Sequence, residues 1–181
     1  VIADNVIRGQ GVGAGIAVSG GSARLVHMTL ARNRGGDGSG LAATGGASVW
    51  LTNTIAVSHT VAITAANGSS AVAVATLWGA GDWANLADMG GVATSAGPHV
   101  TGLPDFVTIG DKPFHIGRQS AALDAGIDAG VVEDIDGHVR PLGRGVDLGA
   151  DESLAIWLPL ILRSVALVGL AMWATIYFLT Q

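Results

Sequence analysis

Cysteine is absent from the 181-residue chain, and lysine occurs once, at Lys112. Without thiols the protein has no disulfide framework, no thiolate zinc site, no iron–sulfur cluster and no cysteine nucleophile. Charged residues make up 13% of the chain and the formal net charge is −5, whereas an average globular domain is roughly 25% charged. We expect no nucleic-acid partner, because phosphate binding needs clustered Lys and Arg.

Glycine is abundant instead, with 28 residues, about twice its usual share of ~7%. All but one of these glycines, and all 14 acidic residues, lie within residues 1–153. The composition changes abruptly after Ser153, where a strongly apolar segment begins. We therefore expect a glycine-punctuated β domain over residues 1–153 and a separate element over residues 154–181.

Residues 154–181 carry a single charge, Arg163. A bilayer core of ~30 Å needs ~20 helical residues. The segment is apolar on all sides, which argues against the alternative of an amphipathic helix buried in a soluble domain. Trp157 at one end, and Trp173 and Tyr177 near the other, occupy the positions of an aromatic belt. We expect one transmembrane helix here, with the lipid bilayer as its partner.

Short β-prone segments recur in the first part of the chain at offsets of 22 to 25 residues. Segment 18–31 repeats as segment 43–56 at an offset of 25, and Asn53-Thr-Ile matches Ala75-Thr-Leu at 22. A period of this kind indicates the stacked coils of a solenoid. We expect an all-β protein with about three coils of parallel β-helix over residues 1–78.

Several residues of these coils have predicted structural roles. Glycines in the turns supply the positive φ that sharp corners need, and they are Gly20, Gly21, Gly45 and Gly46. Asn33 and Asn53 end apolar runs, where an amide bonds turn backbone or stacks as a ladder on the neighbouring coil. The first strand of the stack presents an open parallel edge, which we expect upstream coils or another chain to cover.

Residues 79–153 are richer in loops and predict a cap on the coils. Four motifs occur there in order: Pro-Asp-Phe (104–106), Ser-x-Ala-x-Asp-Ala-Gly (120–126), Asp-x-Asp-Gly-x-x-Arg-Pro (134–141) and Val-Asp-x-Gly-Ala-Asp-Glu (146–152). Together they closely resemble the C-terminal part of bacterial right-handed parallel β-helix proteins of the choice-of-anchor Q type. The chain departs from that pattern at Ala121, where proline is usual, and at Ser153, where an aromatic residue usually follows the glutamate.

This resemblance implies a pectate-lyase-like fold and an exported domain tethered by a C-terminal device. The positive-inside rule, applied to Arg163 alone, would place the domain in the cytoplasm. The resemblance outweighs that single charge. We therefore expect a single-pass membrane protein with its β domain on the extracytoplasmic side.

Acidic residues concentrate near the end of the predicted cap. Asp134, Asp136 and Asp147 predict a calcium site, because carboxylate oxygens are hard ligands. The Asp-x-Asp-Gly core resembles the start of an EF-hand loop, but it lacks the later ligands of that motif. The structural alternative, which we favour, is that Asp134 and Asp136 bond turn backbone and pair with Arg140.

Aromatic residues suggest a second site. Trp78 and Trp83 flank a glycine turn and are candidates for stacking on a sugar ring, with core packing as the equal alternative. Trp50 falls within a strand, where a core position is as plausible as an exposed one. The five histidines are scattered without a metal-ligand spacing, and no catalytic set or organic cofactor can be assigned.

These observations predict a membrane-anchored extracytoplasmic β-helix module that is non-catalytic and binds a glycan or a protein partner. A variant is an accessory subunit whose helix packs among other transmembrane subunits through small residues. The alternative class is an enzyme, a polysaccharide lyase or hydrolase with its catalytic coils upstream of Val1. The coils themselves hold only two acids, Asp4 and Asp37. They fall in different coils beside glycine turns, so we expect no pair of facing catalytic carboxylates there.

Overall fold

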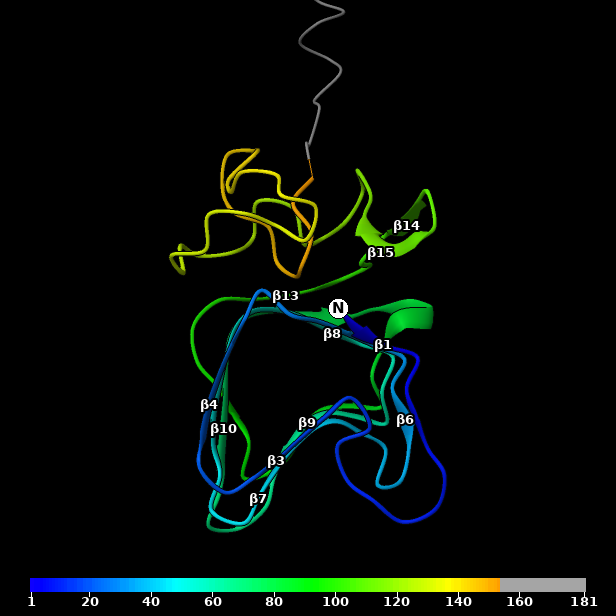
Figure 1. Ribbon diagram of the computed structural model, residues 1–181, viewed down its shortest axis with the longest axis vertical. Coiled ribbons are helices and arrows are strands. Elements are labelled where there is room, and N and C mark those ends of the chain that lie inside the picture. Colours follow the sequence, from blue (N-terminus) through cyan, green and yellow to red (C-terminus); the bar gives the residue numbers. More distant parts are fainter. Residues whose placement is uncertain (154–181) are drawn as a thin grey trace, which may run out of the picture.

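The computed structural model describes residues 1–153 and shows a parallel β-solenoid of about four turns. One wall is a seven-stranded sheet, formed by β1 (Ile2–Ala3), β4 (Ser22–Val26), β5 (Thr29–Ala31), β8 (Ser48–Val57), β10 (Ser70–Gly79), β12 (Thr94–Ser95) and β13 (His99–Gly102). The second wall contains β3 (Ile16–Ser19), β7 (Ser39–Thr44), β9 (Val61–Ala65) and β11 (Ala87–Gly91). A short third wall pairs β2 (Val6–Ile7) with β6 (Arg34–Gly35). Figure 1 looks along the stacked turns.

The stack has one turn more than the repeats predicted. β11, β12 and β13 all follow residue 78, and each pairs in parallel with a strand of the preceding turn. The loop-rich cap expected over residues 79–153 therefore begins with a further turn of solenoid, which includes the 3₁₀ turn η1 (Gly81–Trp83). β11 reads Ala-Asp-Met-Gly-Gly, a sequence poor in the β-branched and aromatic residues that identify strands.

The register of the strands explains the repeat offsets. Val18 pairs with Ala43, at the predicted offset of 25, whereas Leu25 pairs with Leu51, at an offset of 26. The turn between β7 and β8 is one residue longer than that between β3 and β4. The predicted offset is therefore right for the pairing of β3 with β7 and wrong by one residue for the pairing of β4 with β8. Because a one-residue slip exchanges the two faces of a strand, the predicted pairing of Leu25 with Trp50 would have placed Trp50 inside.

Aliphatic columns run through the interior, perpendicular to the strands. Ile16, Leu41, Ile63 and Met89 occupy one register position in four successive turns. Leu41 and Ile63 are fully buried, and each such side chain contributes ~1.5–3 kcal/mol of hydrophobic stabilisation. The alanines of the same strands let the two walls approach each other.

Corners of the solenoid repeat from turn to turn. The four predicted glycines all have positive φ. A second kind of corner uses other residues: His27, Asn53 and Ala75 are in register and have φ of 51°, 54° and 51°. A left-handed conformation is unfavourable for a residue with a Cβ, so its recurrence at one register position shows that the stack imposes it.

Amides link the turns, as predicted for Asn33. The Asn5 amide donates to Asn33 Oδ1 at 2.9 Å, and Asn33 Nδ2 donates to the Ile2 carbonyl at 2.9 Å and lies 3.3 Å from His59 Nε2. Asn53 also links neighbouring turns, because its Nδ2 lies 3.0 Å from His27 Nε2. In addition it ties the solenoid to the rest of the chain: its Nδ2 donates to the Ile127 carbonyl at 2.6 Å and its Oδ1 accepts the Ile127 N–H.

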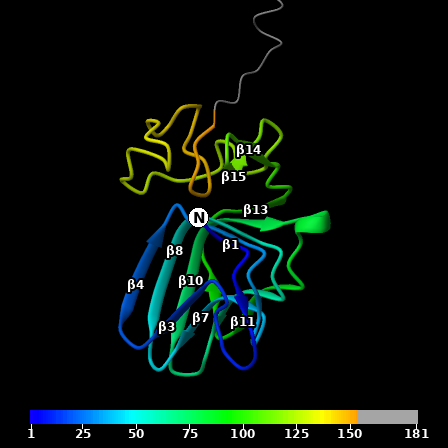
Figure 2. The ribbon, with the colours of Figure 1, turned by 45° about the vertical axis from the view of Figure 1, so that its right-hand side comes forward.

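Residues 103–153 form a C-terminal lobe that lies along one side of the solenoid (Figures 1 and 2). The lobe contains the antiparallel hairpin β14 (Phe106–Ile109) and β15 (Lys112–Ile116), followed by loops. Ile116 and Leu148 of the lobe pack in one buried cluster with Ile55 and Leu77 of the solenoid. The lobe and the solenoid thus share a hydrophobic core.

Within residues 1–153, no helix has the length and apolar character needed to span a bilayer. The transmembrane helix predicted for residues 154–181 lies outside the described residues.

Candidate functional site

The most exposed tryptophan of the described solenoid wall is Trp50. It is the third residue of β8, and 52% of its surface is exposed. Its strand neighbours Val49 and Leu51 point inward and are fully buried, because successive side chains of a strand alternate between faces. Arg24 of β4 lies beside Trp50 on one side and Val72 of β10 on the other. The Trp50 ring therefore stands on the outer face of the sheet, over β8 and between β4 and β10. Figure 2 shows these three strands side by side.

Hydroxyl groups form a row along the same face. Ser22, Ser48 and Ser70 are in register across β4, β8 and β10, two residues before the row that contains Trp50. The Ser48 and Ser70 hydroxyl oxygens are 3.2 Å apart. We call the outward residues of these two rows the Trp50 face: Ser22, Arg24, Ser48, Trp50, Ser70 and Val72. It offers an apolar ring, donors from a guanidinium and hydroxyls of both donor and acceptor character.

Trp78 and Trp83, the predicted sugar-stacking pair, lie elsewhere. Trp78 is 6% exposed and packs in the main core cluster, so its ring offers no face to a ligand. Trp83 meets the Phe106 ring edge-on at 5.0 Å between centroids, and the Arg32 guanidinium lies over its ring at 5.4 Å. Both tryptophans thus have packing roles, the alternative that the sequence left open. Alternation within Ser48–Thr52 was the signal that could have identified Trp50.

The two acids of the first three turns are used within the coils. Asp4 accepts two hydrogen bonds from Arg32, at 2.8 and 2.7 Å. Asp37 Oδ1 accepts from the Ser39 N–H and hydroxyl and from the Gly13 N–H. Each carboxylate therefore fixes a corner, and the two do not face each other across a cleft as a hydrolase requires.

Two histidines are buried between turns. Burial lowers the pKa of His59 to about 4, although a hydrogen bond with Asn85 opposes this. Burial and the charge of Arg140 lower the pKa of His27 to about 4. Both rings are therefore neutral at pH 7, which suits their contacts with Asn33 and Asn53.

A buried ion pair organises the C-terminal lobe. Arg140 donates to Glu152 Oε2 at 2.6 Å and to the carbonyls of Gly149 and Ala150 at 3.1 and 2.8 Å. Glu152 also accepts the N–H groups of Leu142 and Asp147. The sequence predicted that Arg140 pairs with Asp134 and Asp136, and that prediction is wrong. Arg140 pairs with Glu152, the last acid of the Val-Asp-x-Gly-Ala-Asp-Glu motif.

The three predicted calcium ligands have separate partners. Asp134 Oδ1 accepts the N–H groups of Asp136 and His138 at 2.8 Å, and its Oδ2 accepts the Glu152 N–H. This is the turn role expected as the alternative to metal. Asp147 accepts the N–H groups of Asp124 and Ser153. Burial and the nearby charges of Glu152 and Asp124 raise the pKa of Asp147 to about 7 despite these hydrogen bonds.

Asp136 belongs to a different group, with His115 and Asp151. One ligand atom from each of these residues lies within 4.8 Å of the others. His115 Nε2 is 2.5 Å from Asp136 Oδ2, and the Lys112 ammonium is 2.7 Å from Asp136 Oδ1. Burial disfavours the charged imidazole, but the hydrogen bond with Asp136 and the charge of Asp151 outweigh it, so the pKa of His115 is raised. The residues are far apart in sequence, and no motif spacing reveals the group.

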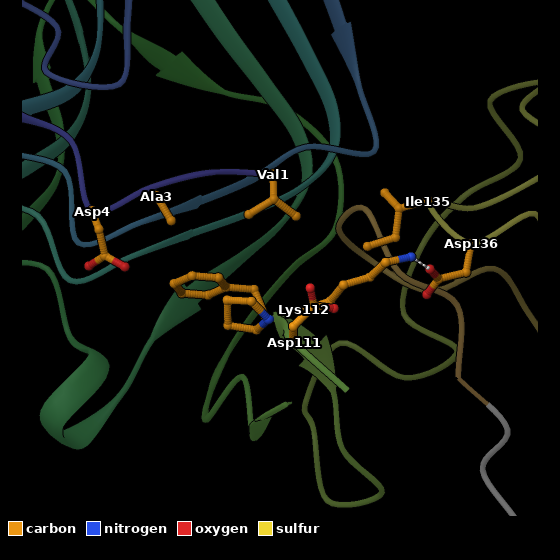
Figure 3. Close-up of a pocket in the computed structure, with 9 residues that line it drawn as sticks. Val1, Ala3, Asp4, Asp111, Lys112, Ile135 and Asp136 are labelled. Atoms are coloured by element: carbon orange, nitrogen blue, oxygen red, sulfur yellow. Dashed lines mark hydrogen bonds and ion pairs between the residues drawn. The ribbon is translucent and has the colours of Figure 1, made fainter. Parts of the chain in front are cut away.

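An open hollow of about 580 Å³ lies beside this group, between the first turn of the solenoid and the lobe. Figure 3 shows Val1, Ala3 and Asp4 on the solenoid side and Lys112 reaching Asp136 on the lobe side. The hollow gives solvent access to Asp136, while His115 is 1% exposed. The polar group therefore has one buried side and one open side.

Fold and geometry together define a parallel β-solenoid with a laterally packed loop-rich lobe. Comparisons of the chain with protein-family models, with curated proteins and with solved structures find no match.

Proposed function

We propose that the chain is a non-catalytic, extracytoplasmic β-helix module of the right-handed, choice-of-anchor Q type, which binds polysaccharide on the Trp50 face and is tethered by its C-terminal segment. The observation that carries the binding proposal is the exposure of Trp50 on the outer face of the sheet, between Arg24 and Val72 and beside the serine row. An indole offers a ligand a large apolar face together with a polar N–H, which suits stacking on a ring.

The surroundings of Trp50 favour a polysaccharide over a protein partner. Neighbouring strands of a sheet lie ~4.8 Å apart, so the two rows of the Trp50 face run at a regular spacing across the strands, which suits a linear, repeating ligand. The indole packs against the C–H face of a sugar ring, and the serine row lies where sugar hydroxyls need partners. Arg24 beside the ring adds a donor for a carboxylate, which favours acidic polysaccharides.

A non-catalytic role agrees with the use of the coil acids. Asp4 and Asp37 are bound to Arg32 and to turn backbone, and the Trp50 face contains no carboxylate. An enzyme of the lyase or hydrolase class would have its catalytic groups in coils outside this chain. The membrane tether rests on the length and apolarity of residues 154–181.

Binding is tested by affinity electrophoresis of the full chain, in mild detergent, through gels containing polygalacturonate, alginate or dextran. We expect retardation by an acidic polysaccharide and its loss in Trp50→Ala. Leu86→Ala is the matched control, because Leu86 is a large apolar side chain that is 84% exposed outside the Trp50 face. Retardation that survives in Trp50→Ala, or its absence with all three polymers, would overturn the proposal.

The tether is tested separately, by carbonate extraction of membranes and by protease treatment of intact cells. We expect the chain to stay in the membrane pellet and the β domain to be cleaved from outside. Release by carbonate, or protection of the domain in intact cells, would contradict the proposed location.

A further inference from the structure

The group formed by His115, Asp136 and Asp151 has the composition of a metal site. It supplies one imidazole nitrogen and two carboxylates, and one ligand atom of each lies within 4.8 Å of the others. Two metal bonds of ~2.0–2.1 Å join atoms at most ~4.2 Å apart, so small side-chain rotations would bring all three atoms onto one ion. His115 Nε2 and Asp136 Oδ2 are closer, at 2.5 Å, and a rotation of the Asp136 side chain would open room for an ion between them.

Hydrogen bonds outside the group hold two of its members in place. His115 Nδ1 lies 3.1 Å from the Lys112 carbonyl, which can only accept, so Nδ1 carries a proton and Nε2 faces the two carboxylates. Metal-binding histidines usually have this second hydrogen bond to a carbonyl or carboxylate. Asp151 Oδ2 accepts the Ile116 N–H at 2.8 Å, which leaves its other oxygen for a ligand role.

The contacts of the group already bring positive charge to this place, because His115 Nε2 and the Lys112 ammonium both lie against Asp136. Asp151 adds a second carboxylate within 4.8 Å of the other two ligand atoms, and it is buried, as is His115. A proton on Nε2 bonds Asp136 Oδ2, whereas a divalent ion that displaces this proton and Lys112 would bind one atom of each of the three residues. We propose that His115, Asp136 and Asp151 bind a divalent transition-metal ion of the Zn²⁺ class, independently of polysaccharide binding.

The ligand set selects the ion. Imidazole suits zinc and the later first-row metals, and calcium takes oxygen ligands. The site therefore differs in residues and in metal from the calcium site predicted for Asp134, Asp136 and Asp147. Asp136 also lines the 580 Å³ hollow, through which water could reach an ion bound to it. Lys112 leaves Asp136 when the ion binds, and its side chain is 61% exposed and free to turn into solvent.

Such an ion would connect three parts of the lobe. His115 is on β15, Asp136 is in the turn after Asp134, and Asp151 lies near the end of the described chain. Few regular strands hold these loops together, and the bonds to the ion would cross-link them. Binding to the folded state alone raises the unfolding temperature.

The test is isothermal titration of Zn²⁺ into the EDTA-stripped full chain in mild detergent at pH 7.5, with thermal unfolding followed in parallel. We expect one saturable site, a higher unfolding temperature with Zn²⁺, and no response to Ca²⁺. Asp136→Asn should weaken Zn²⁺ binding at least tenfold and abolish the temperature shift. This variant removes one ligand from the open side of the site, so the fold should survive, which circular dichroism would verify.

His138→Gln is the matched control, because His138 is exposed and pairs with Asp134 outside the group. It should bind Zn²⁺ as the unmodified chain does. Absence of a saturable site, equal binding by Asp136→Asn, or loss of binding in His138→Gln would overturn the proposal. Retardation by polysaccharide is measured on the same samples. Because the metal site is proposed independently of the Trp50 face, the metal result stands whether or not polysaccharide binds.

Discussion

Replacing Arg140 by methionine tests the buried ion pair of the C-terminal lobe. Methionine keeps an apolar stem of similar reach but removes the guanidinium. Glu152 would then be buried as an unpaired carboxylate, and the carbonyls of Gly149 and Ala150 would lose their donors. Removing one partner of a buried pair costs about 3–5 kcal/mol.

The hydrogen bonds of Arg140 lead to a similar figure. The bond to Glu152 joins two charged groups and contributes ~1.5–3 kcal/mol, and the bonds to the two carbonyls contribute ~1 kcal/mol each. We therefore expect Arg140→Met to lower the free energy of unfolding of the lobe by about 3–5 kcal/mol. Urea unfolding of the full chain measures this loss, and hydrogen exchange at the Leu142 and Asp147 amides, which both bond Glu152, assigns it to the lobe.

Two further variants make the reasoning refutable. Arg144 is exposed, so Arg144→Met should change stability by less than ~0.5 kcal/mol. In Arg140→Met/Glu152→Met neither charge of the pair is left buried, so the double variant should be more stable than Arg140→Met alone. A loss below ~1 kcal/mol in Arg140→Met, or a double variant less stable than the single one, would show that the pair does not organise the lobe.

Two other predictions concern the solenoid. The pKa of the His59 imidazole is lowered from 6.5 to about 4 by folding, so between these pH values the unfolded state binds a proton and the folded state does not. The free energy of unfolding should therefore decrease as pH falls from about 6.5 to 4, by up to ~3 kcal/mol at ~1.4 kcal/mol per pKa unit. In urea unfolding, His59→Gln should lose less stability over that pH range than the unmodified chain, and equal losses in the two chains would refute the effect. Asp147 has the opposite trend, because its raised pKa lowers stability as pH rises from 3.8 to about 7. This contribution is the same in both chains and cancels in the comparison. At Gly40 an added Cβ would lie 2.7 Å from the His59 ring and 2.8 Å from the Ala62 carbonyl, so Gly40→Ala should cost at least ~1–3 kcal/mol. Thermal unfolding checks this against Gly145→Ala, a glycine without positive φ whose added Cβ would lie no closer than 3.3 Å to its neighbours. A smaller loss in Gly40→Ala than in Gly145→Ala would contradict the stacking.

The solenoid could be predicted from sequence because its contacts repeat. Val18 and Ala43 are neighbours in space and hold equivalent positions in two turns, so the stacking is visible as an offset. The later turn was missed because β11 pairs in parallel with β9 although it lacks the β-branched and aromatic residues that identify a strand in sequence. The one-residue error at β8 arose in a turn, where length varies without changing the pattern of the strands.

The sites depend on contacts that no period records. Trp50 is exposed because of the alternation in β8, which the strand pattern contains once the register is known. His115 and Asp151 meet because the lobe folds back along the solenoid, and loops bring them together. Glu152 pairs with Arg140 for the same reason. Sequence spacing is informative within strands and motifs, and it is silent about which loops meet.

Disulfide trapping tests the parallel register on which the Trp50 face depends. The chain has no cysteine, and the Ser48 and Ser70 hydroxyl oxygens are 3.2 Å apart, so the pair Ser48→Cys/Ser70→Cys has the separation that a disulfide needs. In the control pair Ser48→Cys/Val74→Cys the second cysteine lies four residues further along β10, ~13 Å away at ~3.3 Å per residue. After mild oxidation, peptide mass spectrometry should find the cross-link in the first pair and not in the second; a cross-link in the second pair, or none in the first, would contradict the stacked parallel turns.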